Sequence, residues 1–210
     1  MRIVQTYSHL NGEEFLQVHR AKAYQEIREV IQSVNAFDLR TKTSREKTMR
    51  GKKLYSPPKL NQAFRKHFHS LGWAERRYDY CVTTNREYLE SLTNLSLAEQ
   101  REFLQSKGIK EPDESYKQTD FVKDRIAVEV QFGKYSFVAY DLFVKHLLFY
   151  TGSVIDVGVE ILPVKAMAKD PKGGRTMSTG IAYYEGEVYN ILRHGRSSPP
   201  VPLVLIGICP

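Results

Sequence analysis

Residues 119–137, TDFVKDRIAVEVQFGKYSF, constrain the fold of this chain more than any other segment. From residue 125 to residue 132 apolar and polar side chains alternate, which is the period of a β-strand with two different faces. Lys123 and Asp124 interrupt the apolar pattern, and Asp at such a point is typical of a turn. The segment therefore predicts a β-hairpin in which Glu129 and Gln131 point to the same side.

Two carboxylates of this hairpin can converge. Asp120 lies on the first strand and Glu129 on the second, and Gln131 follows two residues later, a D-x8-E-x-Q spacing. Mg²⁺ prefers oxygen ligands, and the backbone carbonyl of Val130 is available as a further one. Alone the pattern is weak, because an acidic residue on a strand is usually just solvated. The apolar residues around Glu129 favour a strand inside the sheet, where a carboxylate needs a partner or a metal ion.

The charge of the chain favours a polyanionic partner. Lys and Arg number 31 against 24 Asp and Glu, which gives a formal net charge of +7 and a sequence pI near 9.3. Such a balance favours nucleic acid as the partner, although an ordinary enzyme can also be basic. Residues 40–53, RTKTSREKTMRGKK, concentrate the charge in a run that we expect to form a loop able to lie along phosphates.

The rest of the chain alternates between helical and strand patterns. Helices are predicted at 15–34, 57–71, 140–150 and 183–192, with two short ones between 85 and 107. The 140–150 helix is rich in Leu and Phe, and we expect it to be buried. Strands are predicted at 78–83, 154–162 and 201–208. Together with the hairpin they predict an α/β fold, a mixed central β-sheet flanked by α-helices, in a single domain spanning 1–210.

Several classes of protein are disfavoured. No stretch approaches the roughly 20 apolar residues of a membrane span, and the first residues lack a signal-peptide pattern, so we expect a cytoplasmic protein without membrane association. Cys81 and Cys209 match no metal spacing. His67 and His69 diverge on a helix, and His146 is expected to be a core histidine, so a zinc nuclease is disfavoured.

Residues 120–135 resemble the catalytic hairpin of the PD-(D/E)xK nucleases. They are most similar to the BamHI/BglII group of type II restriction endonucleases, in the BglII form with Gln in place of the usual Lys. Runs over the whole chain extend the resemblance to this group: MRIV, YSHLNG, EVQFGKYSFVAYDLFVKH, IDVGVEILP and VPLVLIGI. The resemblance implies a restriction-endonuclease-like fold and Mg²⁺-dependent cleavage of double-stranded DNA.

Carried over by residue, the resemblance implies that Asp120 and Glu129 bind Mg²⁺ and that Val130 adds its carbonyl. Gln131 takes the position of the family lysine, and Thr119 replaces the Pro of the motif. Because an amide cannot act as a charged proton donor or as a base, the metal and the scissile phosphates must activate the water.

Glu75 falls roughly where relatives place another polar active-site group, so it joins the catalytic candidates.

Two segments match the loops with which the family reads bases in the major groove. The first gives Lys134, Tyr135 and Ser136, directly after the catalytic strand, and the second gives Ser178 and Thr179. Arg193 and Arg196 are candidates for phosphate contacts, although Arg near a helix C-terminus also interacts favourably with the helix dipole. Lys134 can likewise be an ordinary surface lysine.

The resemblance implies a palindromic target with a GATC core, 5′-RGATCY-3′, cut after the first base to leave a 5′-GATC overhang. Two-fold DNA implies a homodimer, with the helices at 140–150 and around Tyr183 as candidates for the interface. A cognate DNA methyltransferase acting on the same site is a further implied partner. Two alternatives stay open: a nuclease of the same fold that recognises DNA structure, and a basic DNA-binding protein without catalysis.

Overall fold

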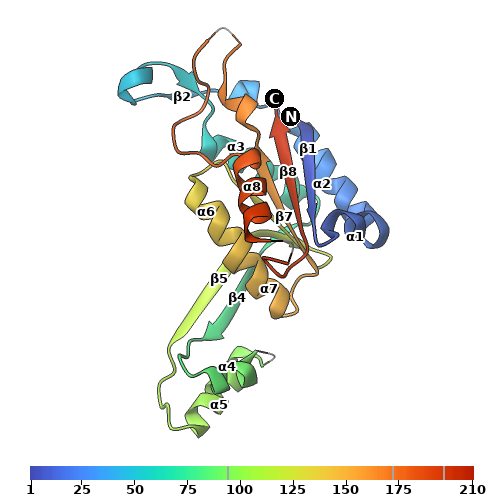
Figure 1. Cartoon of the computed structure of the whole chain (residues 1–210), viewed down its shortest axis with the longest axis vertical. Helices are drawn as coiled ribbons and strands as arrows, with labels where there is room; N and C mark the ends of the chain where they lie inside the picture. Colours follow the sequence, from blue (N-terminus) through green and yellow to red (C-terminus); the bar gives the residue numbers. More distant parts are fainter. Residues whose placement is uncertain (94, 172, 196) are drawn as a thin grey trace.

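A computed structural model of the chain describes residues 1–93, 95–171, 173–195 and 197–210, and its main feature is a mixed β-sheet (Figure 1). In these residues six strands form the sheet in the order β1-β8-β7-β6-β5-β4. The strands are β1 (Arg2–His9), β4 (Ala74–Cys81), β5 (Glu114–Lys123), β6 (Ile126–Val130), β7 (Val157–Pro163) and β8 (Leu203–Cys209). Strand β7 runs parallel to β6 and β8, and the other pairs are antiparallel. The predicted mixed sheet is confirmed.

One face of the sheet is covered by α1 (Gly12–His19), α2 (Ala21–Ser33) and α3 (Pro57–Ser70). Alternate residues of the central strands, such as Val128 and Val159, belong to the same core as Ile27, Phe64 and Phe68 of these helices. All five side chains are fully buried. Burying each such side chain contributes about 1.5–3 kcal/mol to folding, so this layer fixes which side of the hairpin faces the core.

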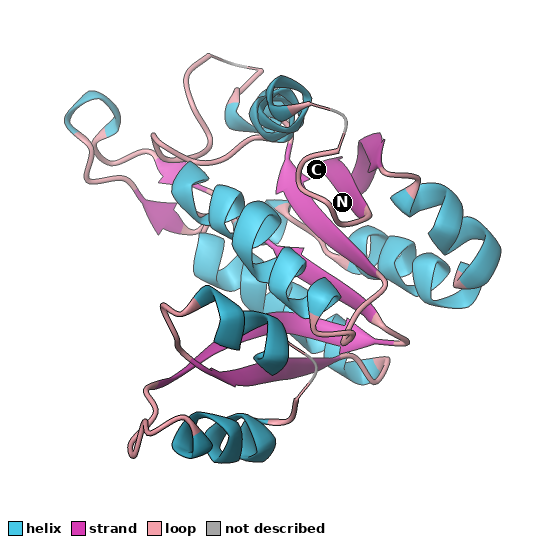
Figure 2. Cartoon of the chain, turned by 60° about the horizontal axis from the view of Figure 1, so that its bottom comes forward, coloured by secondary structure: helices cyan, strands magenta, loops and turns pink. Residues whose placement is uncertain are grey.

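The opposite face is covered by one long helical stretch and by α8 (Tyr184–His194), and Figure 2 shows the strands lying between the two helical layers. The stretch comprises α6 (Tyr135–Tyr140), a π-helical turn η3 (Asp141–Lys145) and α7 (His146–Thr151). Gly158 of β7 lets this stretch approach closely, because a Cβ there would lie 2.5 Å from His146 Nδ1. The polar side of the hairpin therefore faces this helical stretch.

Strands β4 and β5 extend beyond their neighbours and carry α4 (Arg86–Leu92) and α5 (Leu97–Ser106) at their far end (Figure 1). The two helices form a small core of their own with Cys81, Leu92 and Leu104. The predicted capping box opens α5: Ser96 Oγ accepts a hydrogen bond from the Glu99 amide at 3.4 Å, and Glu99 accepts one from the Ser96 amide at 2.7 Å.

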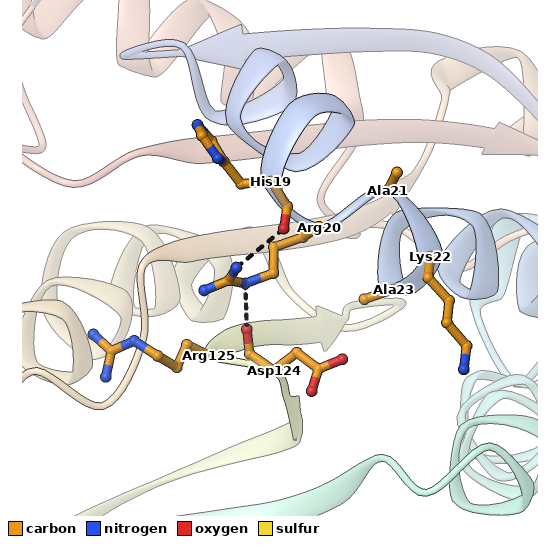
Figure 3. Close-up of a pocket in the computed structure, with 7 residues that line it drawn as sticks. All are labelled: His19, Arg20, Ala21, Lys22, Ala23, Asp124 and Arg125. Carbon is orange, nitrogen blue, oxygen red and sulfur yellow. Dashed lines mark hydrogen bonds between the residues drawn. The ribbon is translucent and has the colours of Figure 1, made fainter.

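A two-residue turn closes the β5–β6 hairpin. Asp124 and Arg125 both adopt positive φ, 48° and 62°, as a hairpin turn that matches strand twist requires. Figure 3 shows the shallow pocket beside this turn, where Arg20 donates hydrogen bonds to the backbone oxygens of Asp124 and His19, both at 3.0 Å. Arg20 and Arg125 both pair with Asp156, at 3.2 and 2.7 Å, so these ion pairs connect three segments of the chain.

Among the described residues the remaining small elements are β2 (Lys42–Thr43) and β3 (Lys53–Leu54), which pair as a separate hairpin, and three 3₁₀ turns. These turns are η1 (Phe37–Leu39), η2 (Lys47–Met49) and η4 (Lys165–Ala168). The run at 40–53 is therefore a short ordered hairpin. None of the helices in the described part of the chain is long and apolar enough to cross a membrane.

Several sequence predictions need correction. The helix at 15–34 is two helices, because Arg20 leaves the helical conformation at φ −139°. The helix at 140–150 is longer and only partly buried, with Tyr140 at 39% and Tyr150 at 38% exposure. Strand β1 was not predicted, and β4 begins and ends earlier than the predicted strand at 78–83. Strand β7 lies at 157–163 rather than 154–162, and β8 at 203–209 rather than 201–208.

Candidate active site

The candidate site lies where strands β5 and β6 separate. Phe121 and Val128 form the last pair of the β5–β6 ladder in this direction, and Asp120 and Glu129 are the next residues on the two strands. Glu129 Oε1 accepts a hydrogen bond from the Asp120 backbone amide at 3.3 Å. The two predicted carboxylate residues are thus brought together, on the side of the sheet that faces η3.

A cavity of about 520 Å³ opens at this point. Asp120, Glu129, Val130 and Gln131, four of the predicted site residues, line it. The other lining residues are Asn61, Tyr116, Lys117, Gln118, Phe137, Tyr140, Asp141 and Lys145. The cavity therefore combines carboxylates at its base with lysine, amide and aromatic side chains around it.

Asp141 and Lys145, from the π-helical turn η3, were not predicted as site residues. The Lys145 ammonium lies 2.7 Å from Asp141 Oδ1 and 2.9 Å from Glu129 Oε1. All three side chains are nearly buried, at 14% exposure for Lys145 and 4% for each carboxylate. The signal in the sequence was an Asp and a Lys four residues apart within an apolar stretch, where burial demands that they be paired.

Burial dominates the electrostatics of this group. Burial raises the pKa of Glu129 to about 8, and the charge of Lys145 opposes the rise. Burial also raises the pKa of Asp141. Burial alone would lower the pKa of Lys145, but Glu129 and Asp141 together raise it. The carboxyl groups of Glu129 and Asp141 are therefore costly to ionise unless positive charge lies beside them.

The amide of Gln131 is already engaged at both ends. Its oxygen accepts a hydrogen bond from the Gly133 amide at 2.9 Å, and its nitrogen donates to Asp141 Oδ2 at 3.4 Å. Gln131 therefore links the end of β6 to η3, and its oxygen points to the backbone of the following loop.

The donor set at the cavity suits a hard divalent cation. The carboxylate of Asp120 has no hydrogen bond or ion pair with any residue that the structure describes, and Glu129 and Val130 line the same cavity. Within the described ranges, no three His, Cys, Asp or Glu side chains gather as a metal-binding group. Mg²⁺ needs no such group, because it is commonly bound through one or two carboxylates and retains several waters.

Glu75 lies on β4, outside the lining of the cavity. It accepts a hydrogen bond from Gln118 at 2.9 Å and pairs with Arg65 at 3.4 Å, with 42% of its side chain exposed. Since Gln118 does line the cavity, Glu75 is one hydrogen bond removed from the site.

The two predicted base-reading loops lie side by side. Lys134 and Ile181 form a β-bridge, the Tyr135 amide donates to Gly180 at 3.3 Å, and the Ala182 amide donates to Gly133 at 3.1 Å. The candidate side chains of these loops are exposed or half-buried: Lys134, Tyr135, Ser136, Ser178 and Thr179. They form one surface continuous with the end of β6.

The β2–β3 hairpin is fastened to this surface. Lys42 donates a hydrogen bond to Ser178 Oγ at 2.7 Å, and Glu46 accepts bonds from the Thr179 amide and hydroxyl, both at 3.2 Å. The basic run thus extends the surface of the two loops. Arg193 lies apart from them, in the last turn of α8, with its guanidinium 5.6 Å from the Tyr189 ring. Arg196 lies outside the described residues.

His146 is a core residue, as predicted. It is 1% exposed, and its Nε2 lies 3.1 Å from Glu160 Oε1 of β7. Burial lowers the pKa of His146 to about 3 and raises that of Glu160 well above its usual range. The contact is a buried hydrogen bond between α7 and β7, made by the residue that follows Lys145 in the chain.

The comparisons with known proteins agree on the family. The family model described as restriction endonuclease BglII/BglIII matches residues 4–208. Among solved structures, restriction endonuclease BglII complexed with a DNA 16-mer matches with a TM-score of 0.64 at 19% identity, covering 100% of this chain and 77% of that chain. Free BglII matches with a TM-score of 0.58 at 17% identity, covering 100% and 80%. No curated protein matches.

A match over nearly the whole chain shows family membership, and the two BglII structures show the same fold. The chain therefore belongs to the restriction endonuclease BglII/BglIII family and is a type II site-specific endonuclease.

Proposed function

We propose that this chain acts as a homodimer that cuts both strands of DNA at a palindrome with a GATC core, 5′-RGATCY-3′, after the first base, with Mg²⁺ as cofactor. The observation that carries the metal-dependent cut is the pair Asp120 and Glu129 at the base of an open cavity beside two exposed loops. The proposed DNA target is inferred from the amino-acid segments quoted in the sequence analysis, which resemble those of the restriction endonuclease BstYI.

In this proposal Asp120, Glu129 and the Val130 carbonyl hold Mg²⁺. When bound, the ion supplies charge neutralisation at the scissile phosphate and a water of lowered pKa. Gln131 holds the end of β6 against η3 through its bond to Asp141 and so keeps Glu129 in place.

In the described part of the chain Glu75 is linked to the cavity by its hydrogen bond from Gln118, so in this proposal it is a positioning residue.

DNA recognition falls to the joined loops and the hairpin. Lys134 and Tyr135 lie in the segment that follows the catalytic strand β6. A base contact made by these residues can therefore shift the end of the strand that carries Glu129. The hydroxyls of Ser136, Ser178 and Thr179 can donate to or accept from base edges, whereas Arg193 and Arg196 would contact phosphates. A cognate methyltransferase would protect the same site in the host genome.

Plasmid digestion tests the proposal. With Mg²⁺ the protein should give discrete fragments whose ends ligate to other 5′-GATC overhangs. A smear, cleavage confined to branched DNA, or no cleavage would refute it and would favour, respectively, a non-specific nuclease, a structure-specific nuclease, or a non-catalytic DNA-binding protein.

Asp120→Asn tests the metal role separately. We expect cleavage to fall by about 10³-fold or more, because a carboxylate ligand is lost, while specific binding of a GATC duplex persists. Gel-shift and cleavage assays on the same duplex measure the two properties. Retained cleavage would contradict the assigned metal role, and joint loss of binding and folding would show a structural role instead.

A further inference from the structure

Lys145 is a largely buried, charged side chain of the cavity to which the proposed function gives no task. It lines the cavity, and its ammonium lies between Glu129 and Asp141 at 2.9 and 2.7 Å. We infer that Lys145 supplies the fixed positive charge of the active site, facing the scissile phosphate from the helix η3 while Glu129 faces it from β6. The inference rests on the proposed phosphodiester hydrolysis.

The charges around the cavity explain why a fixed cation is needed there. Asp120, Glu129 and Asp141 place three carboxylates around the position where a phosphodiester would have to enter. The phosphate adds negative charge, and its transition state adds more. A preorganised ammonium in a partly water-excluded site lowers that repulsion without having to reorganise during the reaction.

Gln131 cannot take this task, although it occupies the neighbouring position on the catalytic strand. Its amide is neutral, its oxygen is bound to the Gly133 amide, and its nitrogen bonds to Asp141. Asp141 is therefore contacted from both sides, by Gln131 at 3.4 Å and by Lys145 at 2.7 Å. Lys145 therefore brings a positive charge from the helix to the side of Glu129, and Asp141 fixes the direction of this ammonium.

The local backbone supports this placement. Asp141 and Lys145 are the first and last residues of the π-helical turn η3, which interrupts the helix between α6 and α7. π-Helical turns are rare in proteins as a whole, but those that occur are often found at functional sites. Such a turn repositions side chains that a regular helix would direct elsewhere. Below the turn, the His146–Glu160 hydrogen bond fastens the helix to β7.

A second ion-paired, partly buried lysine, on strand β5, provides a matched control. Lys123 of β5 pairs with Glu26 at 2.7 Å and is 24% exposed, but it does not line the cavity. Lys145→Gln and Lys123→Gln each remove one half of a largely buried ion pair. If Lys145 has only a structural role, the two variants should behave alike.

We expect Lys145→Gln to lower the single-turnover cleavage rate by about 100-fold or more, and Lys123→Gln to leave the rate within about threefold at a temperature where both are folded. A second readout is duplex affinity without metal and with Ca²⁺. Lys145→Gln should weaken metal-free binding by about tenfold, and Ca²⁺ should restore most of it, because the cation replaces the missing charge. Lys123→Gln should show no such metal-dependent difference.

Lys145→Gln with Asp141→Asn covers the case in which the single variant fails to fold. The double variant removes one positive and one negative charge together, so the net charge of the group is unchanged and Glu129 is the one carboxylate that loses its cationic partner. It should fold, bind the duplex and still cleave at least about 100-fold more slowly than the parent. Parental cleavage by either Lys145 variant would overturn the inference while leaving the proposed function standing. A parent protein that cuts no DNA would overturn both.

Discussion

Gln131 shows how one amide can set the charge balance of a site. The Gln131 side-chain nitrogen donates a hydrogen bond to Asp141 Oδ2 at 3.4 Å. A carboxylate at position 131 has no such donor and would face the Asp141 carboxylate across the same distance. Two ionised carboxylates at that distance in a nearly buried position repel each other. The identity of residue 131 therefore depends on residue 141.

We expect Gln131→Glu to lower the cleavage rate by about tenfold at subsaturating Mg²⁺ and the unfolding free energy by about 1–3 kcal/mol, because a buried hydrogen bond becomes a repulsion. Adding Asp141→Asn should restore both, since the amide and carboxylate are then exchanged across one contact. Single-turnover kinetics and urea unfolding measure the effects. A Gln131→Glu variant that cleaves as well as the parent would show that the contact is unimportant.

At the level of single residues, the sequence predicted the two hairpin carboxylates of the site but not the two charged residues of η3. Asp120 and Glu129 could be paired because strand alternation fixes the side of each residue within one hairpin. Asp141 and Lys145 meet Glu129 from a helix on the same face of the sheet. Strand periodicity says nothing about which helix packs there. The stretch at 140–150 was also interpreted as buried, which hid the possibility that its charged residues face a cavity.

At the scale of elements, Asp156 joins three segments at the closed end of the catalytic hairpin. It receives hydrogen bonds from Arg125 at 2.7 and 2.9 Å and from Arg20 at 3.2 Å. These contacts fasten the junction of α1 and α2 and the start of β7 to the turn between β5 and β6.

This junction should give the stability a dependence on pH. Hydrogen bonds from Arg125 lower the pKa of Asp156 below its usual 3.8, so its contribution is complete above that value and is lost as the pH falls through the lower folded-state pKa. Asp156→Asn should cost about 1 kcal/mol at pH 7, and the difference from the parent should shrink below about pH 4. Urea unfolding across this range measures it. A difference that is constant with pH would contradict the assignment.

The β2–β3 hairpin offers a second prediction for an element. Arg45 and Lys47 lie in the connection between its two strands, next to the surface of the joined loops. Arg45→Ala with Lys47→Ala should weaken binding to all DNA sequences alike and should reduce the slope of log affinity against log salt by about 2, because two phosphate contacts are lost. Lys110→Ala, at an exposed lysine after α5, serves as the control. An unchanged slope would show that the hairpin does not contact DNA.

Elements with strong local signals were predicted well, and those fixed by tertiary contacts were not. Helix α3 was predicted from Pro57 and its apolar spacing, and α5 from its capping box. Strand β1 escaped because it is an edge strand whose residues are mostly exposed or half-buried, so no clean alternation marks it. The break at Arg20 escaped because its cause is a contact with Asp124 and Asp156, more than 100 residues away in the sequence.

At the scale of the whole molecule, the proposed dimer needs a surface. The helical layer on the cavity side of the sheet exposes large apolar side chains at Phe137, Val144, Tyr189 and Leu192, between 42% and 60% exposed. The sequence singled out the same two helical regions as candidates. We propose that this layer forms the two-fold interface.

Leu192→Asp tests this interface, because a charge buried on association should weaken the dimer by at least about tenfold. The parent should sediment at twice 24.3 kDa, and the variant should shift toward the monomer and nick one strand instead of cutting both. Val18→Asp on α1, which is 74% exposed on the opposite side of the sheet, should stay dimeric. A monomeric parent, or a dimeric Leu192→Asp protein, would contradict the assignment.

The two ends of the chain meet. Arg2 of β1 pairs with Cys209 of β8, and the Arg2 side chain donates a hydrogen bond to the Pro210 backbone oxygen at 3.4 Å. The N- and C-termini therefore lie next to each other where strands β1 and β8 pair. Chain ends that lie this close tolerate joining by a short linker. An affinity tag would occupy the same place from either end, so moving it from one terminus to the other would not move it across the molecule.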